Sequence, residues 1–110
     1  YKAMKLLVGM DLGDKVCLIT DGRFSGSNNG CFVGHICPEA ADDGPIAYLE
    51  DGDEILVDVL QGTIEAPGVD FIERRRTKAC VQKKITGCLY QYARNVSSAS
   101  KGGIIPVREL

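Results

Sequence analysis

Glycine-containing turns divide this sequence into short segments and limit its possible folds more than any other feature. Thirteen of the 110 residues are glycine, more than the roughly 7 % of average usage. They gather in connecting stretches, which predicts many turns and backbone lying close to a ligand or a neighbouring segment. A chain of this length is expected to form one domain, residues 1–110, that buries roughly 60 to 70 % of its unfolded surface in a single core.

Hydrophobic periodicity predicts helices toward both ends of the chain and strands between them. Residues 2–9 have one apolar helical face, and Asp70 followed by Glu73 is a capping box for a helix that runs to Lys84. Further short elements follow from apolar runs bounded by turn residues. They are helices at 38–41 and 88–96, and strands at 15–20 (buried), 46–49, 54–60, 63–66 and 104–105, with a hairpin turn at 50–53. The predicted fold class is mixed α/β.

Composition excludes several classes of partner. The net charge is −2 and the isoelectric point is near 5.3, so neither nucleic acid nor an anionic membrane surface would be attracted. The one basic run, Arg74 to Arg76 with Lys78, is interpreted as a solvated helix face. No apolar run reaches the roughly 18 residues of a membrane-spanning helix, and no signal peptide is recognisable.

The five cysteines form no Cys-x-x-Cys pair. Their odd number argues against a secreted disulfide framework and their spacing against a zinc knuckle, which predicts reduced thiols in the cytoplasm. Cys17 and Cys31 are interpreted as small apolar fillers beside a strand and a loop. The chain begins at Tyr1, without methionine, directly in a helical pattern, and we therefore expect it to be a piece of a longer protein.

The glycine-rich stretch 21–34 is the candidate functional loop, because its composition suits tight turns and backbone amides that face a bound group. Its serine, Ser25, stands one position too late for the Gly-x-Ser-x-Gly motif of hydrolases, and no phosphate-binding glycine motif is present. His35 with Glu39 lacks the further ligands of a metal site. A triad of Ser25, His35 and Asp21 or Asp43 is possible on residue types alone.

Four blocks of sequence together resemble the dihydroxy-acid and phosphogluconate dehydratase family. They fall in the family's order and span nearly the whole chain, so that a chance match is improbable. The blocks are residues 18–26 (LITDGRFSG), 34–41 (GHICPEAA), 44–53 (GPIA with EDGD) and 92–102 (YAR with SSASKG). The resemblance identifies the chain as a C-terminal domain of this family, and its last block is closer to the dihydroxy-acid and sugar-acid branch.

The resemblance implies a β-barrel-like swivelling β/β/α domain with flanking helices. It implies a hydro-lyase that dehydrates a 2,3-dihydroxy acid or sugar acid to a 2-keto acid, in branched-chain amino acid biosynthesis or sugar acid metabolism. In the family an iron–sulfur cluster accepts the departing hydroxyl and Mg²⁺ chelates the substrate. The cluster cysteines and most magnesium ligands belong to a preceding N-terminal domain, so no metal is assigned to residues 1–110. A homodimer is implied for the full-length enzyme.

The family's proposed catalytic base, a serine that removes the C2 proton, corresponds to Ser25. Arg23, Gly26 and Ser27 are then the candidate substrate-binding residues, although Arg23 suits a structural salt bridge equally well. Residues 27–29 depart from the common family pattern and leave the substrate open, as the sequence leaves open the cluster type, the role of His35 and that of the Ser97 to Lys101 tail. The alternative functions are a non-catalytic module that binds a small anion and a serine hydrolase that uses Ser25 and His35.

Overall fold

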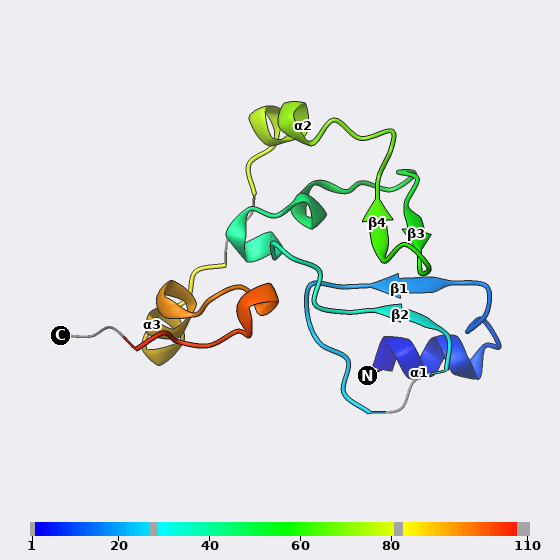
Figure 1. Cartoon of the computed structure of the whole chain (residues 1–110), viewed down its shortest axis with the longest axis horizontal. Helices are drawn as coiled ribbons and strands as arrows, with labels where there is room; N and C mark the ends of the chain where they lie inside the picture. Colours follow the sequence, from blue (N-terminus) through cyan, green and yellow to red (C-terminus); the bar gives the residue numbers. More distant parts are fainter. Residues whose placement is uncertain (1, 27–28, 81–82, 108–110) are drawn as a thin grey trace.

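The computed structural model describes residues 2–26, 29–80 and 83–107. Over these ranges the chain forms three α-helices, three 3₁₀ helices and two separate two-stranded sheets (Figure 1). The mixed α/β prediction is therefore confirmed, whereas the barrel-like closure stays a prediction. In chain order the elements are α1 Lys2–Gly9, β1 Cys17–Ile19, β2 Cys31–Val33, η1 Ala40–Asp42, η2 Pro45–Tyr48, β3 Leu56–Asp58, β4 Thr63–Glu65, α2 Phe71–Thr77, α3 Cys88–Asn95 and η3 Ala99–Lys101.

The first sheet is a parallel pair, β1 with β2, in which Cys17 lies opposite Cys31 and Ile19 opposite Val33. The strand predicted at 15–20 is thus confirmed at its centre, but it is not buried: Cys17 is exposed and Ile19 only half-buried. β2 lies inside the stretch interpreted as a loop. That interpretation was wrong for residues 31–33, because three β-forming residues between glycines give too short a pattern to be recognised.

The second sheet is an antiparallel hairpin, β3 with β4, in which Val57 lies opposite Ile64. The strand at 63–66 and the centre of the strand at 54–60 are confirmed. The strand predicted at 46–49 was wrong, since residues 45–48 form the 3₁₀ helix η2 with Pro45 in its first turn. A proline fixes φ near the helical value and has no N–H for a strand ladder, so it favours a helix start here.

The helix α2 begins where the capping box predicted, because the Asp70 carboxylate accepts hydrogen bonds from the N–H groups of Ile72 and Glu73, both at 3.0 Å. It ends at Thr77 rather than at Lys84. The Thr77 hydroxyl donates to the carbonyl oxygens of Glu73 and Arg74, and β-branched residues are weak helix formers.

The predicted helices at the two ends of the chain are confirmed as α1 and α3, and the one expected at 38–41 appears two residues later as η1. Residues 104–105 are not a strand. The Ser97 N–H donates to the Ile104 carbonyl at 2.8 Å, and the Ile104 N–H donates to the Ser97 hydroxyl at 3.1 Å. These two bonds close a loop around η3 in place of a sheet.

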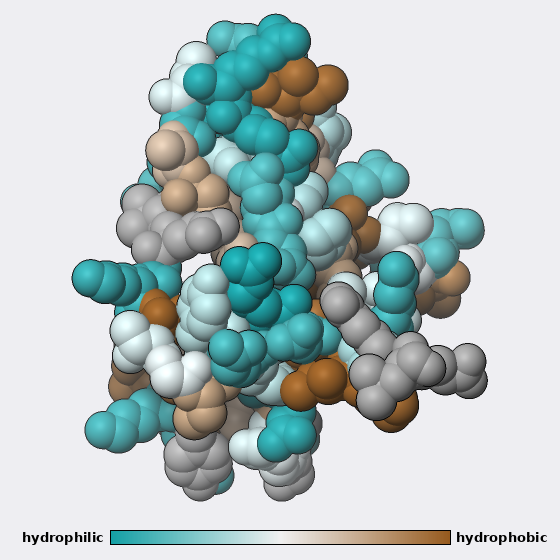
Figure 2. All heavy atoms as spheres, turned by 90° about the vertical axis from the view of Figure 1, so that its left-hand side faces the viewer, coloured by the Kyte–Doolittle hydropathy of each residue, from teal (hydrophilic) through white to brown (hydrophobic). Residues whose placement is uncertain are grey.

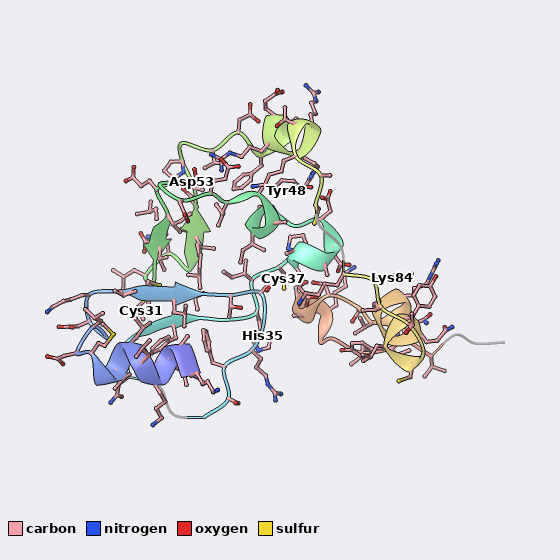
Figure 3. The ribbon with its side chains drawn as sticks, turned by 180° about the vertical axis from the view of Figure 1, so that it is seen from behind. Cys31, His35, Cys37, Tyr48, Asp53 and Lys84 are labelled. Atoms are coloured by element: carbon pink, nitrogen blue, oxygen red, sulfur yellow. The ribbon has the colours of Figure 1, made fainter. Side chains whose placement is uncertain are left out.

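Charged side chains hold α2 on the segment that precedes the hairpin. The basic run is exposed at Arg75, Arg76 and Lys78, as the interpretation of a solvated face expects, whereas Arg74 is half-buried. Arg74 donates both guanidinium arms to the Asp53 carboxylate, at 2.5 and 2.7 Å, and a further bond to the Tyr48 carbonyl at 2.9 Å. Arg75 pairs with Asp43 at 3.0 Å. Lys78 pairs with Glu50, also at 3.0 Å, and a pair within α2 joins Arg76 to Glu73 at 3.9 Å. Figure 3 shows Tyr48 and Asp53 beside α2.

Only Met4 and Tyr48 are hydrophobic residues that the described part of the chain buries fully. An apolar hollow of about 330 Å³ remains near the end of β1, and Figure 2 shows brown, hydrophobic side chains at the surface. The accessible surface is 8939 Å², so folding buries about half of the unfolded surface. This buried share is smaller than the roughly 60 to 70 % expected from the length of the chain. Residues that line the hollow include Ile19, Ile36, Ile46, Leu49, Ile64 and Phe71.

Candidate functional site

The candidate site is the loop 20–30 that connects the parallel strands β1 and β2 and carries Ser25. Backbone hydrogen bonds continue the strand pairing at its start: the Thr20 N–H donates to the Val33 carbonyl at 2.9 Å, and the His35 N–H donates to the Gly22 carbonyl at 2.9 Å. The chain leaving β1 and the chain leaving β2 therefore run together for several residues. The base of the loop is fixed by main-chain geometry.

Asp21 ties this base to the next element. Its carboxylate accepts a hydrogen bond of 2.8 Å from the Ala40 N–H, at the start of η1. Carboxylates are favourable beside such free N–H groups, because no carbonyl within the helix can satisfy them. Asp21 therefore serves the fold, and among the described residues no hydrogen bond or ion pair joins it to His35 as the proposed triad would require.

Phe24 anchors the loop directly before the serine. Its ring centroid lies 5.5 Å from that of Phe32 on β2, at a tilt of 59°, within the range of favourable aromatic pairs. Gly34 makes room for this ring: a Cβ there would lie 3.3 Å from the Phe24 Cδ2 atom. With the Phe24 ring turned toward β2, the next residue in the chain, Ser25, lies exposed.

The loop bends at two glycines that follow the serine in the sequence. Gly26 has φ of +108° and Gly30 has φ of +130°, values that residues with a Cβ rarely adopt. A Cβ at Gly30 would lie 2.5 Å from the Gly13 carbonyl oxygen, and one at Gly13 would lie 3.1 Å from the Asn29 carbonyl oxygen. The far end of the loop is therefore pressed against the turn after α1.

The loop presents Ser25 and Arg23 outward. Both side chains are exposed, and within residues 2–26, 29–80 and 83–107 neither has a hydrogen-bond or ion-pair partner. The structural salt bridge considered for Arg23 is thus not formed with any described residue. Ser27, the third candidate substrate contact, lies outside the described residues. A serine fixed on one side by an aromatic anchor and on the other by two glycines is well placed to meet a separate molecule or domain.

His35 does not complete a site with Ser25. It is exposed and has a left-handed backbone, with φ of 55°, and its side chain bonds neither Ser25 nor Glu39 in the described part of the chain. No group of three or more His, Cys, Asp or Glu side chains there is arranged to hold a metal ion. No described helix is long and apolar enough to cross a membrane.

Comparison with known proteins places the chain in the class of dehydratase C-terminal domains. The chain belongs to the dihydroxy-acid/6-phosphogluconate dehydratase C-terminal family, whose model matches residues 1–103. It is 52 % identical over 102 residues to the dihydroxy-acid dehydratase of Aquifex aeolicus (strain VF5), a match that covers 90 % of this chain and 18 % of the relative. The chain thus spans about a fifth of the length of this relative, and the family inferred from sequence blocks is confirmed.

Two features of the site were not predicted from the sequence. One is the structural role of Asp21, which depends on an N–H group nineteen positions further along the chain. The other is the close approach of Cys17 and Cys31, whose Sγ atoms lie 3.0 Å apart. Both cysteines are exposed rather than packed as fillers. Recognising β2 would have revealed this pair, since parallel pairing of the two short strands sets their register.

Proposed function

We propose that this chain is the part of a dehydratase that supplies the catalytic base for the conversion of a 2,3-dihydroxy acid or sugar acid to a 2-keto acid. Loss of the C2 proton and of the C3 hydroxyl releases water and leaves an enol, which becomes the keto acid. The observation that carries the proposal is the exposed Ser25 hydroxyl on a loop whose two ends are fixed. Membership of the dehydratase family supports it.

Ser25 is proposed to accept the C2 proton through its Oγ atom. A serine hydroxyl is too weak an acid to be ionised unaided at neutral pH, so a nearby positive charge is required. No described residue hydrogen-bonds to this hydroxyl. We therefore infer that the activating charge is contributed by the rest of the full-length enzyme, and that residues 1–110 alone are inactive.

Arg23 and Gly26 are proposed to bind the substrate, with Ser27 as a further candidate. Arg23 offers a planar fork of N–H donors that matches a carboxylate, and its exposed guanidinium has no ion-pair partner in the described ranges. Gly26 has no Cβ, so that its backbone can approach a substrate oxygen closely. The choice between a branched-chain dihydroxy acid and a sugar acid stays open.

An iron–sulfur cluster or Mg²⁺ does not fit the described residues. A cluster needs several cysteine thiolates at one point, and the described cysteines are free thiols with no metal-binding cluster of His, Cys, Asp or Glu among these residues. We propose that both groups belong to the N-terminal part of a full-length, homodimeric enzyme. Its location is proposed to be the cytoplasm, which free thiols support.

The substitution Ser25→Ala in the full-length enzyme tests this function. Loss of a general base typically lowers the rate by about 10²- to 10⁴-fold, so we expect kcat to fall by that factor while substrate binding persists. Keto-acid formation is measured with both branched-chain dihydroxy acids and sugar acids. The exchange of the C2 proton with solvent deuterium should fall equally, because it reports the same proton transfer.

A matched control is Thr63→Ala, which removes an exposed hydroxyl from β4 and should leave both rates unchanged. Turnover by Ser25→Ala within twofold of the unmodified enzyme would contradict the role of Ser25. Ester hydrolysis lost in both Ser25→Ala and His35→Ala would favour the hydrolase instead. Tight binding of sugar acids by a protein without dehydratase activity would favour the anion-binding module.

A further inference from the structure

We propose that Cys17 and Cys31 form a reversible intramolecular disulfide when the protein meets a low-molecular-weight disulfide. The two residues are register partners at the start of β1 and of β2, and their Sγ atoms lie 3.0 Å apart. Figure 3 labels Cys31 within this strand pair. The assignment depends on this geometry alone and is independent of the proposed dehydratase reaction.

The backbone already has the separation that a disulfide requires. Neighbouring strands lie about 4.7–4.9 Å apart, and bridged cysteines have Cα atoms about 4.4–6.8 Å apart. Forming the bond brings the sulfur atoms from 3.0 Å to about 2.05 Å. A change of this size needs only small rotations of the two side chains. Of the other three described cysteines, Cys37 and Cys80 donate to backbone carbonyls, and Cys88 is exposed on α3.

Both thiols are accessible to a small reagent. Cys17 and Cys31 are exposed, and both line a cavity of about 670 Å³ between the end of α1 and the strand pair. Pockets for small organic ligands typically span about 300–1,000 Å³, so a disulfide of cysteine or of a short peptide can enter. One cation, Lys15, and two carboxylates, Asp11 and Asp14, line the same cavity, so entry of the reagent depends on the size of the cavity and not on an attraction between charges. The remaining lining residues include Val8, Asn29 and Gly30.

The order of attack follows from the protonation of the pair. Partial desolvation, and then the hydrogen bond and charge of Cys31, raise the pKa of Cys17 to about 11. Cys17 therefore keeps its proton at neutral pH, and we assign Cys31 as the first nucleophile. Only thiolates attack disulfides, so the reaction should quicken as the pH is raised above neutrality.

The proposed thiol–disulfide exchange takes place in two steps. The Cys31 thiolate attacks one sulfur of the small disulfide, forms a mixed disulfide and releases the first small thiolate. The Cys17 sulfur then loses its proton, attacks the Cys31 sulfur and releases the second small thiolate. Two electrons pass from the cysteine pair to the reagent, and the two protons end on the released thiols. The product joins the two ends of the loop that carries Ser25.

To test the proposal, the full-length protein is incubated with excess oxidised glutathione, and the remaining thiols are then blocked with N-ethylmaleimide. The protein is digested with trypsin without reduction. Trypsin cuts after Lys15, Arg23 and Arg74, and no Lys or Arg lies between residues 24 and 73. We expect peptide 16–23 to be linked to a peptide 24–74 that carries N-ethylmaleimide on Cys37, with a mass about 2 Da below the sum of peptide 16–23 and this singly blocked peptide. Reduction should separate them.

Peptide 24–74 contains both Cys31 and Cys37, so matched variants decide which cysteine is bridged. The link should disappear in Cys31→Ser and in Cys17→Ser but persist in Cys37→Ser and Cys88→Ser. Its yield after a fixed time should rise severalfold between neutral and mildly alkaline pH. Separate glutathione adducts on Cys17 and Cys31 without a link, or a link that survives Cys31→Ser, would overturn the proposal.

Discussion

Gly30 shows how a single residue without a side chain sets the path of the candidate loop. Its φ of +130° and the Gly13 carbonyl oxygen, 2.5 Å from the position of a Cβ, both disfavour any other residue. The contact brings the turn after α1 and the end of the loop together at the backbone level. The position of the loop that carries Ser25 therefore depends on a close approach between the backbones of Gly30 and Gly13.

We expect Gly30→Ala to lower the free energy of unfolding by about 2–3 kcal/mol, because it combines a strained φ with a backbone clash. Urea denaturation of the full-length protein measures the change. Gly68→Ala is the matched control, since a Cβ there meets nothing within 4 Å and no positive φ is involved. Gly68→Ala should leave stability unchanged or raise it by up to about 1 kcal/mol. Equal losses in both variants would contradict this role for Gly30.

At the level of secondary structure, elements with local signals were predictable from the sequence. α1 and α3 follow from apolar periodicity, and α2 begins at Asp70 because a capping box depends only on residues three apart. The positive φ of Gly26 agrees with the tight turns expected of the glycine-rich stretch 21–34. Each of these features depends on residues that are only a few positions apart in the sequence.

Features that depend on distant partners were not predictable. η2 was mistaken for a strand because its apolar residues fit both periods, and β2 was missed because its pairing partner lies fourteen residues away. The half-buried position of Arg74 in the basic run was not predicted, since its partner Asp53 is distant in sequence. The family blocks located Ser25, but its exposure and its lack of a hydrogen-bond partner among the described residues came only from the structure.

The attachment of α2 makes stability depend on pH. The Arg74 guanidinium, together with the Glu50 N–H, lowers the pKa of Asp53 to about 2 from an ordinary 3.8. A depressed carboxyl pKa stabilises the fold above the unfolded value, and this contribution is lost as the pH falls from about 4 to about 2. The side chain of Asp53 is 11 % exposed, so solvent screens this pair only partly.

We expect Asp53→Asn to lower the melting temperature at neutral pH. The difference from the unmodified protein should shrink as the pH falls to about 2, where Asp53 is protonated in the unfolded state and about half protonated in the folded state. Thermal unfolding of the full-length protein across this range measures the convergence. Asp51 is an exposed residue in the same turn. The melting temperature of Asp51→Asn should follow that of the unmodified protein across this pH range. A constant gap between Asp53→Asn and the unmodified protein down to pH 2 would contradict the Asp53–Arg74 coupling.

On the scale of the whole molecule, the chain exposes far more surface than a free-standing protein of its mass. A folded monomer of 11.9 kDa exposes about 6,000 Å², whereas this chain exposes 8939 Å². Its radius of gyration is 16.2 Å, against about 13 Å for a compact domain of this length. The excess of about 3,000 Å² is more than the roughly 800 Å² that one partner contributes to a standard interface, which supports the proposal that a larger assembly covers this domain.

Substitutions in the β3–β4 hairpin can test whether a larger assembly covers this domain. Leu60 in its turn is 97 % exposed and Val59 is 80 % exposed, so in residues 1–110 alone Leu60→Asp should change stability by no more than about 0.5 kcal/mol. If the assembled enzyme covers the turn, the same substitution buries an unpaired carboxylate and costs at least about 2 kcal/mol. Gln61→Asp, also exposed, adds the same charge without removing apolar surface and should cost less in the assembled enzyme. Urea denaturation of both forms measures the difference, and a Leu60→Asp effect that is equally small in the full-length enzyme would show that the hairpin stays exposed there.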